Sequence, residues 1–193
     1  APRRYSPEKV AAINLAAADL QQDNWKTVFS LGTINPHHNL ATIKEHLKWM
    51  ADDQHKLYGV KLHPLDWDAF QAFDPGDDAY FPIYAEMAKL DLLLTIHCGA
   101  GLRGGEEEFS ATPEKLAKIA ENFPQLRIVA PHLAGASMFD PTQFQNKAEK
   151  DNELLRRWRE AASLLAPHKN ISFDLSWTYF FLNYQNIQEI IHQ

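Results

Sequence analysis

Short apolar runs recur along the chain, and they alternate with longer stretches in which apolar residues come every three or four positions. The runs are rich in Val, Ile, Leu and Phe and end at glycine, proline or polar residues, so they predict strands. These strands fall at 27–36, 59–64, 92–99, 127–135 and 170–177. The longer stretches predict helices at 6–22, 39–54, 78–91, 112–124, 141–166 and 181–193.

The order of these elements is informative. One helix comes first, and strand and helix then alternate five times, which is typical of βαβ units and a parallel sheet. Two architectures fit this order, a doubly wound open sheet and a (β/α)8 TIM barrel, and both place ligands at the carboxyl ends of the strands. The glycines at 99–105 lack the spacing of a phosphate-binding loop, so we interpret that segment as an ordinary loop.

Polar side chains lie near the carboxyl ends of the predicted strands. Because side chains alternate along a strand, Lys61 and His63 share one face, and Asp174 shares a face with Ser172 and Ser176. The opposite faces of these strands are apolar. A barrel with a site in its mouth has this distribution, whereas a sheet covered on both sides would be apolar on both. The pattern therefore favours the barrel.

Two of the predicted strands end on a histidine. His97 shares a face with Thr95, and the same alternation places His132 on a face with Ala130 and Ile128. We expect both imidazoles to point into the same interior. A second histidine on a successive strand, again followed by small residues, makes a shared site a better interpretation than two hydrogen-bonded core histidines.

The residue types at these strand ends suit metal-assisted acid–base chemistry. Imidazole nitrogens are good ligands for zinc and related divalent ions, so a histidine at these strand ends is a candidate metal ligand. A second histidine nearby could take up or give a proton, and Asp174 is a candidate catalytic carboxylate that orients or ligates. An alternative for Asp174 is a hydrogen-bond acceptor at a strand end.

Three further residues are candidates for substrate binding. Lys61, His63 and Arg103 are predicted to line the site, with Arg103 placed to bind a carboxylate from the loop after His97. Each has a simpler alternative. Lys61 can be a salt-bridged lysine, His63 a turn residue before Pro64, and Arg103 a solvated loop residue.

Composition narrows the classes of function. The 193 residues suffice for a single domain over 1–193, and 45% hydrophobic with 23% charged residues is ordinary for a globular protein. The net charge of −6 argues against a nucleic-acid partner. No apolar run reaches the roughly 18–20 residues that span a bilayer, so no membrane partner is expected. With Cys98 as the one cysteine, a reducing, cytoplasmic setting is the expectation.

Four motifs together resemble a known family. GVKLHP at 59–64, LLLTIHCG at 92–99, PQLRIVAPHLAG at 124–135 and NISFDLSW at 170–177 are similar, in this order, to the amidohydrolase-related TIM-barrel hydrolases. That branch includes aminocarboxymuconate-semialdehyde decarboxylase and related decarboxylases, hydratases and lactonases. The resemblance implies a divalent metal, zinc in the first place, at a barrel mouth.

By this resemblance the five predicted strands correspond to barrel strands three to seven. His97 matches the strand-five metal ligand, and His132 matches the strand-six residue that transfers protons or adds a ligand. Lys61 and His63 fall in the strand-four motif. The family's H-x-H pair on strand one and its aspartate on strand eight have no counterpart here, so the sequence resembles an internal piece of a longer protein.

The expected activity is therefore that of a metal-dependent hydrolase acting on a small-molecule carbonyl substrate, an amide or a lactone. Two alternatives stay open. One is a non-oxidative decarboxylase on the same scaffold, and the other is a barrel fragment that has lost its site. Apolar edges on an incomplete barrel would favour association, so a homo-oligomer is a further expectation.

Overall fold

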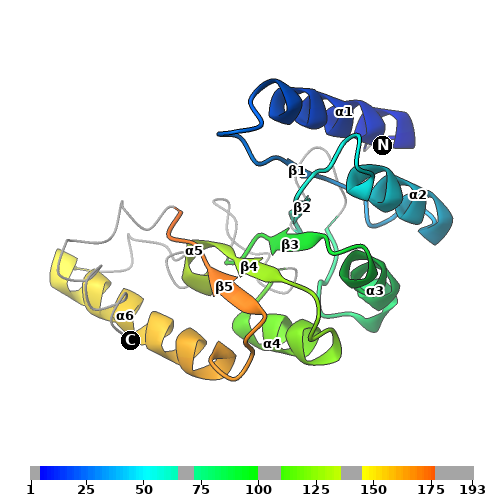
Figure 1. Cartoon of the computed structure of the whole chain (residues 1–193). Coiled ribbons are helices and arrows are strands. Elements are labelled where there is room, and N and C mark those ends of the chain that lie inside the picture. The colour runs from blue at the N-terminus through cyan, green and yellow to red at the C-terminus, as the bar shows by residue number, and fades with distance from the viewer. Residues whose placement is uncertain (1–4, 65–71, 100–109, 136–144, 177–193) are drawn as a thin grey trace.

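Five parallel strands form one sheet whose order follows the sequence (Figure 1). The computed structural model describes residues 5–64, 72–99, 110–135 and 145–176. The strands are β1 (Leu31–Gly32), β2 (Gly59–Leu62), β3 (Leu93–Ile96), β4 (Ile128–Ala130) and β5 (Ile171–Phe173). Each pairs in parallel with the next, which confirms the predicted parallel sheet of alternating strands and helices.

The helices connect these strands at the predicted places. They are α1 (Pro7–Asp23), α2 (Leu40–Ala51), the 3₁₀ turn η1 (Asp78–Tyr80), α3 (Phe81–Lys89), α4 (Pro113–Asn122), the short α5 (Pro131–Ala134) and α6 (Lys147–Leu165). In the described ranges, none is long and apolar enough to cross a membrane. The helix predicted at 181–193, residues 141–144 of the helix predicted at 141–166, and most of the loop at 99–105 lie outside the described residues.

Helix starts follow local sequence chemistry. The hydroxyl oxygens of Ser6 and Thr112 accept the backbone N–H groups of Lys9 and Lys115, and each cap is followed by a proline. Proline suits the first helical position because its missing N–H would have no partner there. Asn39 caps α2 in the same way.

One apolar core joins the sheet to its helices. Leu94 and Ile96 of β3 are fully buried and belong to one cluster with Met87 of α3 and Leu116 and Ile119 of α4. Helix α2 contacts α3, and α4 contacts α6, so consecutive helices cover the same side of the strands (Figure 1). This packing accounts for the apolar face that the sequence predicts on each strand.

The register of the sheet corrects the predicted orientation of β4. Thr95 pairs with Lys61 on one side and with Val129 on the other, and paired residues in a parallel sheet point to the same face. Val129 therefore shares the inner face, and Ile128 and Ala130 point towards the helices. The alternation along the strand predicted that Ile128 and Ala130 share the inner face with His132. That prediction was wrong, because Ile128 and Ala130 face the helices.

The strand predicted at 127–135 is also shorter than expected. It ends at Ala130, and a left-handed turn follows in which His132, Leu133 and Ala134 have φ values of 59°, 54° and 56°. Left-handed backbone costs an L-residue roughly 1–2 kcal/mol. Backbone hydrogen bonds hold this turn in place, among them Leu133 N–H to the Asp174 carbonyl oxygen at 3.1 Å.

A glycine closes this turn against the neighbouring strand. Gly135 has a φ of 84°, and a Cβ built on it would lie 2.7 Å from the backbone nitrogen of Gly99, just beyond β3. A side chain there would clash with backbone that cannot move aside, and it would also be strained by the positive φ. The close approach of the two segments therefore requires glycine at 135.

We expect Gly135→Ala to lower the free energy of unfolding by at least about 2 kcal/mol, because strain and backbone clash add. Gly76→Ala is the comparison variant: its Cβ would lie 2.9 Å from Cγ of Lys115, so a side chain must shift, but the nearest atoms are not backbone and the φ of Gly76 is not positive. We expect this variant to lose clearly less stability than Gly135→Ala. Urea denaturation followed by circular dichroism measures both, and equal losses would contradict the argument.

Candidate functional site

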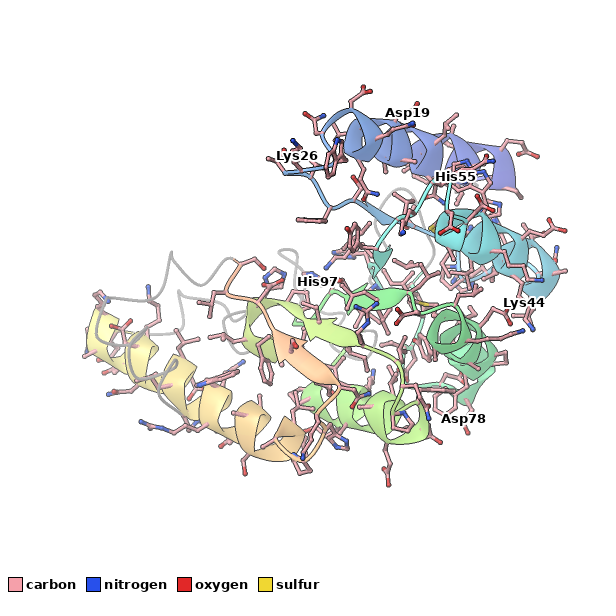
Figure 2. All side chains as sticks on the ribbon, in the orientation of Figure 1. Asp19, Lys26, Lys44, His55, Asp78 and His97 are labelled. Atoms are coloured by element: carbon pink, nitrogen blue, oxygen red, sulfur yellow. The ribbon has the colours of Figure 1, made fainter. Side chains whose placement is uncertain are left out.

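Three histidines meet at the carboxyl end of the sheet. His63 comes directly after β2, His97 directly after β3, and His132 lies in the left-handed turn after β4. Figure 2 shows the labelled His97 among the strands, whereas the labelled Asp19 and Lys44 lie on the outer helices. Parallel neighbours place their carboxyl ends at one edge, so residues far apart in sequence come together there.

His97 is the centre of this group. Its ring stacks on that of His63 with the ring centroids 4.2 Å apart and the planes 17° from parallel. On the other side its Nδ1 lies 3.3 Å from Nε2 of His132. Both His97 and His132 are buried, with 8% and 7% of their surface exposed. The predicted convergence of His97 and His132 is what the structure shows, although His132 arrives by the turn and not along a strand.

One nitrogen of His97 lacks a hydrogen-bond partner in the part of the chain that the structure describes. Nε2 is fully buried, and no donor or acceptor reaches it among the described residues. A buried polar atom without a partner normally costs free energy, so such an atom in a folded protein needs an explanation. A ligand held by this nitrogen is one such explanation.

Burial keeps the central histidines neutral. Burial, together with the neighbouring charges of His63, His132 and Lys61, lowers the pKa of His97 to about 3. Burial also lowers the pKa of His132, although its hydrogen bond to Ser176 and the charge of Asp174 oppose this change. A neutral imidazole keeps one lone pair, which is the form that binds metals and accepts protons.

Lys61 lies on the same inner face of the sheet, opposite Thr95 in the register. It is half-buried, and burial lowers the pKa of its amine, an effect that the charges of Cys98 and Asp174 partly oppose. The neighbouring Cys98 is fully buried, and burial raises the pKa of its thiol to about 12. Cys98 is therefore an unreactive thiol at neutral pH.

Asp174 lies just after β5 and organises a turn. Its Oδ1 accepts the backbone N–H of His132 at 3.2 Å and that of Ser176 at 2.8 Å, and it also accepts the Ser176 hydroxyl. Burial alone would raise the pKa of this carboxyl, but the hydrogen bonds from Ser176 and His132 outweigh it and lower the pKa. The Asp174 carboxylate is therefore tied to the backbone around His132. Its predicted catalytic role stays a prediction.

Ser176 is the residue that sequence reasoning did not select for the site. Its carbonyl oxygen lies 2.9 Å from Nδ1 of His132, and its hydroxyl lies 3.0 Å from the same nitrogen. The spacing Asp-x-Ser is a known signal for a side-chain-capped turn, and it was present at 174–176. Arg103, the predicted carboxylate-binding residue, lies outside the described residues.

The fit to a metal ion is partial in the described part of the chain. No group of three His, Cys, Asp or Glu side chains in residues 5–64, 72–99, 110–135 and 145–176 is arranged to hold one. His97 nevertheless offers a ligand atom of the right type, since Nε2 is buried, belongs to a neutral imidazole and has no hydrogen-bond partner in those same ranges. The chemistry of this atom fits a metal, with further ligands needed to complete the set.

The sequence matches the family model described as amidohydrolase over residues 5–191. The chain belongs to the amidohydrolase family. This match confirms the family resemblance that the four strand-end motifs indicated. No curated protein sequence matches the chain.

Solved structures similar to this chain include a TIM-barrel protein and several enzymes. An uncharacterised TIM-barrel protein from Bordetella bronchiseptica aligns with a TM-score of 0.65 and 15% identity, over 93% of this chain and 53% of that one. An amidohydrolase from Burkholderia multivorans aligns with a TM-score of 0.61 and 14% identity, over 99% of this chain and 60% of that one. 5-Carboxyvanillate decarboxylase from Sphingomonas paucimobilis aligns with a TM-score of 0.55 and 16% identity, over 98% of this chain and 68% of that one.

These similarities confirm the fold class. At identities this low the similarities show the fold alone, and the five βα units of this chain correspond to part of a TIM barrel. The chain spans about half the length of the Bordetella protein. The doubly wound sheet, the other architecture compatible with the element order, is not the one that these neighbours share.

We expect the stability of the metal-free protein to fall as the pH drops from about 6.5 towards 3. Folded His97 stays neutral in this window while the unfolded chain takes up a proton, so protonation favours unfolding. Between pH 7 and pH 5 the parent should lose on the order of 1–2 kcal/mol more than His97→Gln. Urea titrations in the presence of a chelator measure this difference. Identical pH dependence in the two proteins would contradict it.

Proposed function

We propose that this amidohydrolase is a metal-dependent hydrolase of small carbonyl substrates, amides or lactones, with its site at the carboxyl end of the sheet. The observation that carries the proposal is the buried Nε2 of His97 at that end, which has no hydrogen-bond partner within the described part of the chain. His97 would hold a divalent metal, which we expect to be zinc, through this atom. Such an ion lowers the pKa of bound water and polarises a carbonyl group.

His132 is the residue proposed to move a proton. Its Nδ1 faces the Ser176 carbonyl, so Nε2, which also lies 3.3 Å from Nδ1 of His97, is the nitrogen that would take up or release the proton. Burial favours its neutral form, which is the form required of a general base. Asp174 holds the backbone at His132 through its carboxylate.

Lys61 supports a second candidate function on the same scaffold, decarboxylation. Its amine emerges on the inner face beside the histidines, where a cationic group suits a carboxylated substrate. The similar structures include decarboxylases of 5-carboxyvanillate and of 2,6-dihydroxybenzoate. His63 and Arg103 would complete the substrate contacts in either reaction.

The two reactions differ in their products. A lactonase or amidase releases acid or amine with no gas, whereas a decarboxylase releases carbon dioxide. A panel of lactones, amides and aromatic acids, assayed for both kinds of product, distinguishes the two reactions. Lys61→Met should lower the activity on carboxylated substrates selectively. Loss of activity on neutral and carboxylated substrates alike would assign Lys61 a structural role. A small-molecule partner, a cytoplasmic location and a homo-oligomer complete the proposal.

Metal content tests the central claim. We expect elemental mass spectrometry to find close to one zinc per chain in the parent and little or none in His97→Ala, because the variant lacks the Nε2 ligand. His168→Ala is the matched control, since His168 lies after α6 at the amino end of β5, at the opposite edge of the sheet. The control should retain its metal.

Three outcomes would count against the proposal. Parent protein without metal, after refolding with zinc, would show that this chain does not hold one. Equal metal in the parent and His97→Ala would place the metal elsewhere. Loss of metal in His168→Ala as well would show that the assay reports general destabilisation.

A further inference from the structure

The turn at 174–176 connects to the imidazoles by hydrogen bonds that have a fixed direction. Oδ1 of Asp174 accepts the backbone N–H of Ser176, an i to i+2 bond that bends the chain back after β5. The bend places the Ser176 carbonyl oxygen 2.9 Å from Nδ1 of His132. The same Oδ1 accepts the His132 backbone N–H, so one carboxylate oxygen fixes both partners of this contact.

A carbonyl oxygen can only accept a hydrogen bond. The contact with Ser176 therefore requires that the proton of neutral His132 sits on Nδ1. Nε2 of His132 is then left with a lone pair and must act as an acceptor. This assignment follows from the chemistry of the carbonyl and needs no substrate or metal.

The tautomer of His132 in turn determines the tautomer of His97. Nε2 of His132 lies 3.3 Å from Nδ1 of His97, so the acceptor on His132 requires a proton on Nδ1 of His97. The remaining nitrogen of neutral His97, Nε2, then carries a lone pair. This is the same buried nitrogen that has no hydrogen-bond partner among the described residues.

We propose that Asp174 is a positioning residue, which holds the Ser176 carbonyl against His132 and thereby sets the tautomers of both His132 and His97. The result is a chain of hydrogen bonds in which His97 donates to His132 and His132 donates to the Ser176 carbonyl. The lone pair of His97 Nε2 takes no part in this chain. A metal-ligating histidine commonly donates its other ring N–H to a second group, and here that group is another imidazole. The link to a metal rests on the proposed function, but the tautomers do not.

Nitrogen NMR of the metal-free protein tests this directly. The protein is labelled with ¹⁵N-histidine and studied at neutral pH with a chelator present, and His97→Gln and His132→Gln assign the two residues. Long-range proton–nitrogen spectra distinguish protonated from unprotonated ring nitrogens. We expect both residues to carry their proton on Nδ1 in the parent.

Variants of the turn separate positioning from general stability. In Asp174→Ala the proton of His132 should spread to Nε2, and His97 should change with it. Asp174→Asn keeps a side-chain oxygen acceptor and should restore the parent tautomers, and Ser176→Ala keeps the carbonyl and should also match the parent. Asp52→Ala is the matched control, because Asp52 makes the same i to i+2 bond to Gln54 in an exposed turn.

Two results would overturn the proposal. One is a proton on Nε2 of either histidine in the parent, and the other is unchanged tautomers in a folded Asp174→Ala. If circular dichroism shows that Asp174→Ala does not fold, Asp174→Ser replaces it. Its hydroxyl accepts more weakly in the same turn, so a mixture of tautomers is expected and a pure parent pattern would count against the idea.

Zinc titration gives a second measurement. If the proposed function holds, Asp174→Ala should bind zinc about 10–100-fold more weakly than the parent, as is typical when a supporting residue behind a ligand is lost. A parent with the expected tautomers but no zinc binding would refute the proposed function and leave this inference standing. A parent protein that binds zinc but carries the histidine protons on Nε2 would refute this inference and leave the proposed function standing.

Discussion

The left-handed turn after β4 is the constraint on which the site depends. Without it the chain would continue along the strand, and His132 would not reach Nδ1 of His97. Three consecutive residues other than glycine adopt positive φ there, so the turn needs support from its surroundings. Asp174 and the close approach of Gly135 to Gly99 supply that support from the two neighbouring strands.

The support is reciprocal, since the same groups shape the electrostatics of the site. The burial of the turn extends to His97 and His132, and it lowers the pKa of both. Neutral imidazoles need directed hydrogen bonds to fix which nitrogen carries the proton. Ser176 provides such a direction because its carbonyl oxygen can only accept.

The helices form an outer layer that packs against one face of the sheet. The helices bury the face of the sheet that carries Leu94 and Ile96, and the inner face carries Lys61, Thr95 and Val129 together with the strand-end histidines. Membership of the amidohydrolase family agrees with this arrangement, because TIM-barrel enzymes place their chemistry at the carboxyl ends of the strands. Barrels of this kind support several reactions, so the fold alone does not choose between hydrolysis and decarboxylation.

Sequence alone determined the order of strands and helices and the parallel sheet, because those features depend on local patterns of apolar and polar residues. It also identified His97 and His132 as a pair. It misplaced the face of β4, because alternation indicates which residues share a face and not which face is inside. Only the tertiary structure supplied the turn at 132–134 and the role of Ser176. Both depend on contacts between segments more than 40 residues apart, such as the bond from His132 to Asp174, which no local pattern records.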